Sequence, residues 1–146
     1  MKRLLGTLTI ALSLISFSSF ANGEEVSPRT IKSFNQSFKN ATEVKWTVTD
    51  NYSKAEFALN GQYVSAFYDE DGKMIALTRN ISSLQLPIAL QAELKRNYDC
   101  YWISNVFEVA NEEGTSYYIT LETADEQLTL KSNSDSWNTF KKQRKS

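Results

Sequence analysis

The sequence contains no histidine, and this absence excludes more chemistry than any other feature of its composition. Without histidine the chain cannot hold a Ser-His-Asp or Cys-His nucleophile, a histidine metal site, or the usual general base near neutral pH. Only 5 glycines and 2 prolines occur among 146 residues, which argues against a disordered or collagen-like chain. The length is that of one domain, or of two small halves that share one core. We therefore expect a folded protein that is not an enzyme.

Cysteine is almost absent as well, because Cys100 is the only one. No disulfide can form within one chain, and a lone thiol in an oxidising compartment is either buried or available for pairing between molecules. We expect burial, because cysteine is among the most frequently buried residue types. A reactive thiolate would need a cationic neighbour, and no histidine is present to supply it. Nucleophilic catalysis by this thiol is not expected.

The first 21 residues have the pattern of a secretory signal peptide. Lys2 and Arg3 precede an apolar run of 14 residues, 4–17, and Ser19-Phe20-Ala21 places small residues at the −3 and −1 positions of a signal-peptidase site. The apolar run is shorter than the about 20 residues that cross a membrane. Cleavage would leave residues 22–146 and change the net charge from −1 to −3. We expect a periplasmic or secreted protein with no membrane span after cleavage, and no nucleic-acid partner, because nucleic-acid binding needs a basic surface.

The first half of the remaining chain predicts one helix followed by four antiparallel strands. Ser27-Pro28 is typical of a helix start, and apolar residues then recur at helical spacing, which predicts a helix over about 28–41. Alternation of apolar and polar residues predicts strands at about 43–48, 54–59, 62–69 and 73–79. Asn60-Gly61 is the strongest hairpin signal, because both central residues of a type I′ turn need a positive φ.

The second half repeats this order. Leu86-Pro87 begins a second predicted helix, and strands are expected at about 100–110, 115–123, 127–132 and 136–141. Phe38 and Leu94 are 56 residues apart, and so are Trp46 and Trp102. We interpret residues 22–146 as a single domain made of two repeats, about 28–80 and 83–141. Two tandem helix-plus-four-antiparallel-strand units, with the helices on one face of the sheet, form a two-layer α+β fold.

Several short motifs, taken in order behind the signal peptide, resemble a known family. They are Phe38–Trp46, Ala55–Phe57, Tyr68–Lys73, Leu86-Pro87, Tyr98, Ile103 and Tyr118–Leu121. Together they resemble the PepSY-like, β-lactamase-inhibitor-like periplasmic proteins of the Bacteroides type, over about residues 30–140. The resemblance implies the tandem fold and a non-catalytic periplasmic or secreted protein, and it implies no substrate. The chain departs from the family at Ser132–Asp135, where no Asp-x-x-Gly turn precedes the last strand.

Charged residues gather in two places. Asp69, Glu70 and Asp71 form the densest carboxylate cluster, but Thr78 and Arg79 stand where a Ca²⁺ loop would need its last ligand. A turn at Asp71-Gly72 accounts for the same residues, so we expect no metal site and no cofactor. We interpret the one basic cluster as a solvated terminus; it consists of Lys141, Lys142, Arg144 and Lys145.

Alternation also predicts which side chains lie on the sheet face opposite the helices. Tyr63, Phe67 and Tyr118 are expected on this open face, among mixed charges. Aromatic side chains within a polar rim are typical anchors of protein-binding surfaces, although cross-strand pairs that only protect the sheet would give the same pattern. Trp102 is ambiguous, because the 56-residue repeat places it in the core and local alternation places it outside. We expect it in the core.

These observations favour a periplasmic or secreted binding module. Tyr63, Phe67 and Tyr118 would be its anchors, with Asp69 and Asp71 as an acidic contact. The expected partner is another envelope or secreted protein, and the module would inhibit a peptidase or other envelope enzyme by steric occlusion. Two alternatives stay open: a glycan or small-ligand binding protein that uses the same aromatic residues for stacking, and a structural homo-oligomer. The sequence does not give the oligomeric state.

Overall fold

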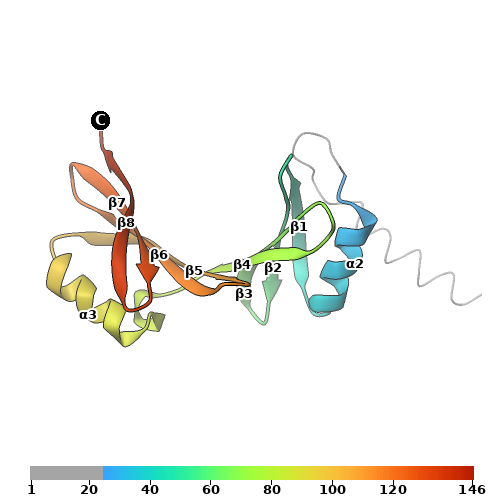
Figure 1. Ribbon diagram of the computed structural model, residues 1–146, viewed down its shortest axis with the longest axis horizontal. Coiled ribbons are helices and arrows are strands. Elements are labelled where there is room, and N and C mark those ends of the chain that lie inside the picture. The colour runs from blue at the N-terminus through green and yellow to red at the C-terminus, as the bar shows by residue number, and fades with distance from the viewer. Residues whose placement is uncertain (1–24) are drawn as a thin grey trace, which may run out of the picture. The chain divides into compact units, whose positions relative to one another are not determined.

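The computed structural model describes residues 25–146, so the predicted signal peptide lies outside the described residues (Figure 1). Along the described chain the elements follow in the order α2, β1 to β4, the short 3-10 helix η2, α3 and β5 to β8. The strands form one eight-stranded sheet in sequence order. None of the helices in residues 25–146 is long and apolar enough to span a bilayer. The predicted α+β fold is confirmed, whereas the division into two repeats with both helices on one face stays a prediction.

The chain divides into two compact units between residues 75 and 76, and each is described by itself. The first unit contains α2 (Pro28–Ser37), β1 (Thr42–Val48), β2 (Ser53–Leu59), β3 (Gln62–Tyr68) and the first residues of β4 (Met74–Asn80). The second contains the rest of β4, η2 (Ser83–Gln85), α3 (Ile88–Asn97), β5 (Trp102–Asn111), β6 (Gly114–Glu122), β7 (Glu126–Asn133) and β8 (Ser136–Arg144).

In the first unit, α2 packs on the sheet through aromatic rings. The helix begins where the Ser27 hydroxyl accepts a hydrogen bond from the Thr30 backbone N–H at 3.2 Å, as the Ser-Pro pair predicts. Phe34 on α2 meets Trp46 and Phe57 edge to face, with ring centroids 5.3 and 5.0 Å apart. Buried residues alternate along β2 and β3, so one face of these strands lies under α2 and the other is open.

The turns of the first unit form as the sequence predicts. Asn60 and Gly61 have φ of 52° and 79°, the pair of positive values that a type I′ turn needs. In the next turn the Asp69 carboxylate accepts hydrogen bonds from the backbone N–H groups of Asp71 and Lys73, both at 2.9 Å. Gly72 has a φ of 80° and lies against the Arg29 backbone, where a Cβ would come within 3.0 Å.

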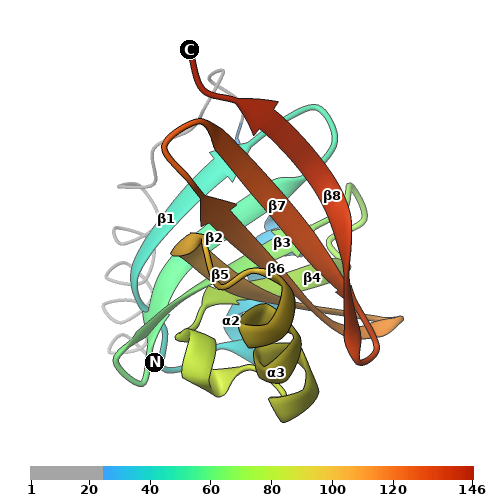
Figure 2. The same ribbon diagram turned by 90° about the vertical axis from the view of Figure 1, so that its left-hand side faces the viewer.

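In the second unit, α3 covers one face of β5 to β8 (Figures 1 and 2). The buried cluster consists of Leu86, Leu90, Leu94, Val106, Ile119, Leu121, Leu128, Leu130 and Trp137. The Trp137 indole N–H donates to the Leu90 carbonyl at 3.1 Å, and its backbone N–H donates to Glu93 Oε2 at 3.1 Å. These bonds join β8 to α3.

Two expectations about single residues are wrong. Trp102 is 53% exposed and not in the core. Strict alternation from buried Val106 would place Trp102 on the core side of β5. The pairing of β5 with β6, however, shifts register between Ile103 and Asn105, and this bulge moves Trp102 to the other face. Cys100 is exposed and not buried, because it lies in the turn between α3 and β5, where no sheet or helix covers it.

Candidate functional site

The structure separates the predicted anchors into two groups. Tyr63 and Phe67 lie on β3 in the first unit, and Tyr118 lies on β6 in the second. Asp69 and Asp71 lie in the turn that follows β3. The two groups are therefore described one after the other.

In the first unit the two aromatic anchors already have partners. Tyr63 is 68% exposed, and its hydroxyl donates to Glu43 Oε2 at 3.0 Å; this hydrogen bond raises the pKa of Tyr63. Phe67 is half-buried and meets the Tyr52 ring edge to face, with centroids 5.3 Å apart. Tyr63 thus offers an exposed ring edge, while Phe67 contributes to a pair that covers the sheet.

The acidic turn of the first unit is structural. Asp69 closes the turn through the two hydrogen bonds described above, and Asp71 forms an exposed ion pair with Arg29 at 3.6 Å. Within residues 25–146 no group of three or more acidic or cysteine side chains is placed to hold a metal ion. The expected turn at Asp71-Gly72 therefore forms.

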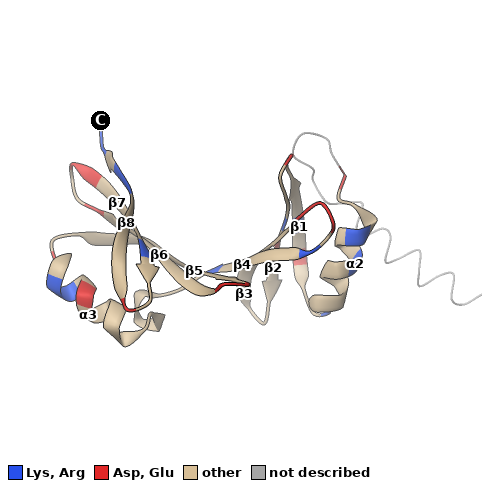
Figure 3. Ribbon diagram, in the orientation of Figure 1, with Lys and Arg blue, Asp and Glu red and all other residues tan. Residues whose placement is uncertain are grey.

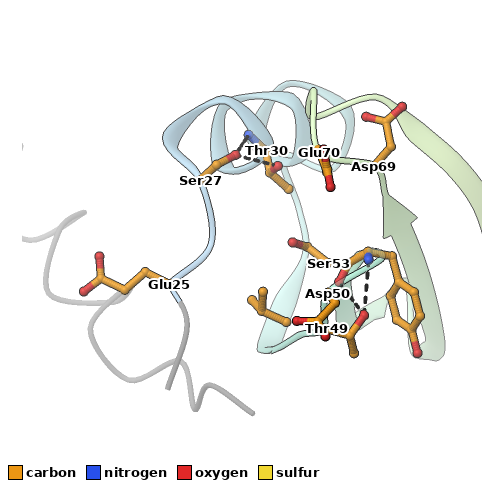
Figure 4. A pocket seen from close by; sticks show the side chains of 10 residues that line it. Glu25, Ser27, Thr30, Thr49, Asp50, Ser53, Asp69 and Glu70 are labelled. Atoms are coloured by element: carbon orange, nitrogen blue, oxygen red, sulfur yellow. Dashed lines mark hydrogen bonds between the residues drawn. The ribbon is translucent and has the colours of Figure 1, made fainter. Parts of the chain in front are cut away.

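A polar depression of about 310 Å³ lies beside this turn (Figure 4). Its walls carry the carboxylates of Glu25, Asp50, Asp69 and Glu70 together with several hydroxyl groups. The hydroxyls of Ser27 and Thr30 lie 2.8 Å apart, and the Thr49 hydroxyl accepts the Tyr52 backbone N–H at 3.1 Å. These hydroxyls are therefore engaged in the helix cap and the β1–β2 turn.

The larger candidate surface belongs to the second unit. We define its outer face as the side of β5 to β8 that points away from α3, opposite the buried Ile119, Leu121, Leu128 and Leu130. Strand pairing places side chains on it in three rows: Phe107, Tyr118, Lys131 and Asn138; then Asn105, Thr120, Thr129 and Lys141; then Trp102, Glu122, Gln127 and Gln143. Tyr118 is therefore on the open face, as the sequence predicts.

Tyr118 is the centre of an aromatic cluster, which we define as Phe107, Tyr118 and Phe140. The Phe107 and Tyr118 rings are stacked with centroids 4.9 Å apart and planes at 2°. Phe140 meets Tyr118 edge to face at 5.3 Å and remains 61% exposed. The Lys131 ammonium lies 5.6 Å from the centre of the Tyr118 ring. The cluster presents one exposed phenylalanine, in ring contact with Tyr118, next to a cation.

Sequence analysis missed two members of this cluster. Phe107 follows buried Val106, and Phe140 lies three residues after buried Trp137, so alternation places both outside. That signal was present. The position of Lys141 beside Phe140 was not predictable, because the β7–β8 register shifts after Thr129, so that Phe140 and Lys141 both lie opposite that residue.

The other end of the outer face, about 13 Å along β6, is occupied by Trp102 and the end of the chain. The Lys145 ammonium lies 4.8 Å from the centre of a Trp102 ring, pairs with Glu122 at 2.9 Å and donates to the Thr123 carbonyl at 2.8 Å. The hydrogen bond from Lys145 lowers the pKa of Glu122. The basic tail thus continues β8 and Lys145 is tied to neighbouring residues, while all four basic residues of the tail remain exposed, as expected of a solvated terminus.

A second ion pair lies where β7 begins. The Tyr101 hydroxyl donates to Glu126, and the Lys142 ammonium lies 3.3 Å from the same carboxylate. The hydrogen bond raises the pKa of Tyr101 to about 12 and lowers the pKa of Glu126. This contact fixes β8 to the start of β7, so two of the four basic tail residues are held by carboxylates.

An apolar groove of about 440 Å³ lies between η2, α3 and β5. Leu84 and Ile88 line it and are 80% and 81% exposed. The Ser82 hydroxyl accepts the Leu84 backbone N–H at 3.1 Å, and the Gln91 side-chain amide donates to the Leu84 carbonyl at 3.1 Å, so η2 is held in place. The groove is a second exposed apolar surface of this unit, which sequence analysis did not identify.

Comparison with known proteins bears on the fold. Neither a family model nor a curated protein matches the chain. A BLIP-like protein from Bacteroides fragilis is 18% identical, with 84% of this chain and 89% of that chain covered at a TM-score of 0.70. A DUF2874 family protein from Bacteroides ovatus is also 18% identical, with 84% and 89% covered at a TM-score of 0.73.

A third solved structure, of a protein from Bacteroides eggerthii that is provisionally described as periplasmic, is 13% identical, with 83% and 90% covered at a TM-score of 0.73. At these identities the similarity shows the fold alone. The chain therefore has the fold of BLIP-like Bacteroides proteins, as the motif resemblance implies. The PepSY-like part of that resemblance stays a prediction.

Proposed function

We propose that the protein is a non-catalytic periplasmic binding module that docks another envelope protein on the outer face of its second unit. The observation that carries the proposal is the aromatic cluster, in which Phe140 is fixed by Tyr118 yet 61% exposed. Binding hot spots are enriched in aromatic side chains that are ordered before binding, because little conformational entropy is then lost. The partner would cover Phe140 and bury the cluster.

A protective role for these rings is less consistent with the geometry. Phe107 and Tyr118 alone would shield the strands beneath them, since their rings lie flat on one another. Phe140 adds an exposed apolar surface on the edge strand, next to Lys131 and away from the core. An ordered apolar side chain within a polar rim is the arrangement that protein interfaces use.

The comparisons support the location and the class of function. A structural neighbour is provisionally described as periplasmic, which agrees with the predicted signal peptide over residues 1–21, and another is BLIP-like. We propose steric occlusion of an envelope enzyme by this rigid face as the mode of action. The proposal that the protein is not an enzyme rests on its lack of histidine. Tyr63, Phe67, Asp69 and Asp71 remain a second proposed contact surface, on the first unit.

An affinity capture tests the proposal. Tagged protein, expressed as the full chain and purified from the periplasm, is incubated with the periplasmic extract of its own organism. We expect one protein to be enriched, and its affinity to fall about thirtyfold or more in Phe140→Ala, because a central aromatic anchor contributes about 2 kcal/mol or more. Leu84→Ala is the matched control, since it removes an exposed apolar side chain on the opposite side of the unit.

The outcomes discriminate between the surfaces and the alternatives. Equal capture by wild type and Phe140→Ala overturns the outer face, and a loss confined to Tyr63→Ala assigns binding to the first unit. An empty capture combined with a tryptophan fluorescence change on addition of envelope oligosaccharides assigns glycan binding. A mass near twice that of the chain in gel filtration, lost in Phe140→Ala, assigns homo-oligomer formation.

A further inference from the structure

We infer that the outer face of the second unit is built for an acidic partner, specifically for a protein segment that presents an apolar side chain flanked by carboxylates. This inference rests on the proposed function and specifies the chemistry of the partner. It is carried by the charges that surround the aromatic cluster.

The three rows of the outer face contain two cations and one carboxylate among uncharged side chains. Lys131 and Lys141 lie in the first two rows, and Glu122 is the only carboxylate of the three rows. Lys145 neutralises Glu122 at 2.9 Å. Within residues 25–146, neither Lys131 nor Lys141 forms an ion pair. Two positive charges on this face are therefore not compensated.

The two lysines flank the exposed ring. Lys131 and Lys141 lie on neighbouring strands two residues out of step, which separates their Cα atoms by about 8 Å. Phe140 is adjacent to Lys141 in the bulge of β8, and Lys131 lies over the Tyr118 ring that Phe140 contacts. A partner residue whose apolar side chain covers Phe140 would thus place the residues next to it within reach of a lysine on either side.

This positive charge stands out against the rest of the molecule. The whole chain has a net charge of −1. The turns between these strands carry further acidic residues, Glu112, Glu113, Asp125 and Asp135, and Figure 3 shows red segments in the hairpin turns. A partner segment that presents carboxylates would be attracted to the lysines between the turns and repelled by the acidic turns themselves, which fixes its orientation.

The test uses short probes of defined charge. Backbone amide shifts of ¹⁵N-labelled protein, purified from the periplasm, are followed while three acetylated and amidated peptides are added: Glu-Glu-Trp-Glu-Glu, Ser-Ser-Trp-Ser-Ser and Lys-Lys-Trp-Lys-Lys. A fourth probe is tetragalacturonate, which has carboxylates without an apolar side chain. We expect the acidic peptide to bind most tightly at low salt and to shift the amides around Tyr118 and Phe140.

The lysines are tested by paired variants. Lys131→Gln/Lys141→Gln is expected to weaken binding of the acidic peptide by about 2- to 25-fold at low salt, because each of the two exposed ion pairs contributes up to about fivefold in affinity. Salt at about 0.5 M should have a similar effect on wild type, since it screens exposed charges. Lys32→Gln/Lys95→Gln is the matched control, which removes the same charge from exposed sites outside the outer face and should leave affinity unchanged.

Each remaining outcome decides against part of the argument. A serine peptide that binds as tightly as the acidic one, and that is weakened by Phe140→Ala, overturns the acidic partner while the proposed function stands. If tetragalacturonate binds more tightly than the acidic peptide, the inference that a protein segment occupies this face is wrong. Equal weakening in the control variant overturns the assignment to Lys131 and Lys141. If no probe shifts the amides of the aromatic cluster, the inference fails, and the capture experiment decides the proposed function independently.

Discussion

Replacing Tyr68 by phenylalanine should make the protein more stable. The side chain is fully buried in the first unit beside Trp46, with ring centroids 6.0 Å apart. Among the residues that the structure describes, its hydroxyl has no hydrogen-bond partner. Burial of a hydroxyl without a partner costs about 1–3 kcal/mol. We expect Tyr68→Phe to raise the free energy of unfolding by about 1 kcal/mol at pH 7, or the melting temperature by about 3–5 °C.

The same variant should change the response to alkaline pH. Burial raises the pKa of Tyr68 to about 12 from the 10.0 of an exposed tyrosine. Between these two values the unfolded chain loses the proton and the folded chain keeps it, so stability falls as pH rises through this window. The phenylalanine variant lacks this contribution, and its advantage over wild type in free energy of unfolding should grow by about 2 kcal/mol from pH 10 to 12.

Urea unfolding followed by circular dichroism and by tryptophan fluorescence measures both effects, and coincidence of the two transitions tests two-state behaviour. Tyr101→Phe is the matched control, because it deletes a hydroxyl that donates to Glu126. The control should be destabilised at pH 7 while Tyr68→Phe is stabilised. A loss of stability in Tyr68→Phe would refute the reasoning, since it would mean that the hydroxyl is hydrogen-bonded in the folded protein.

Three further outcomes follow from single features of the structure. Gly61→Ala and Gly72→Ala both place alanine at a φ near +80°, but only Gly72 packs on the Arg29 backbone. In urea unfolding, Gly61→Ala should therefore lower the free energy of unfolding by about 1–2 kcal/mol, and Gly72→Ala should lower it clearly more. Iodide should quench only the fluorescence of Trp102, because the two other tryptophans are 3% and 6% exposed, and Trp102→Phe should abolish the quenching. The Tyr101 hydroxyl and the Lys142 ammonium lower the pKa of Glu126. The free energy of unfolding should therefore fall as the pH drops below about 4.5. In acid titrations the Glu126→Gln variant should lose less stability than wild type.

The parts of the fold that were predictable depend on local patterns. The Ser27-Pro28 helix start and the Asn60-Gly61 turn are specified by residues that lie next to each other, and both form as expected. The alternation of buried and open positions in β2 and β3 also follows from the local sequence. The helix expected over 28–41 ends at Ser37, because Phe38 leaves the helical conformation while its ring still packs on Phe57.

The parts that were not predictable depend on pairing between strands. A bulge changes the side on which every residue beyond it lies, and no local pattern announces it. For Trp102 the local alternation and the 56-residue repeat disagree, and the bulge in β5 is what decides for the exposed side. Trp137, from the last hairpin, supplies the buried indole of the second unit instead. The ion pairs of Lys142 and Lys145 also could not be predicted without the strand register, because their carboxylate partners lie on other strands.

These irregularities also create the charged surroundings of the proposed binding face. Regular alternation would give Lys141 to the helix side of the sheet and leave Phe140 with one cation nearby. The bulge in β8 sets Phe140 and Lys141 together opposite Thr129, and Lys131 completes the pair of charges around the ring. Sequence analysis found Tyr118 because that residue obeys the period of its strand; it did not find the charged surroundings because they arise where the period breaks. Deletion of Thr139 would remove the bulge, but it would also shift all earlier residues of β8 relative to β7. Substitution of Lys141 keeps the strand register, so it is the cleaner test of whether the bulge contributes to binding.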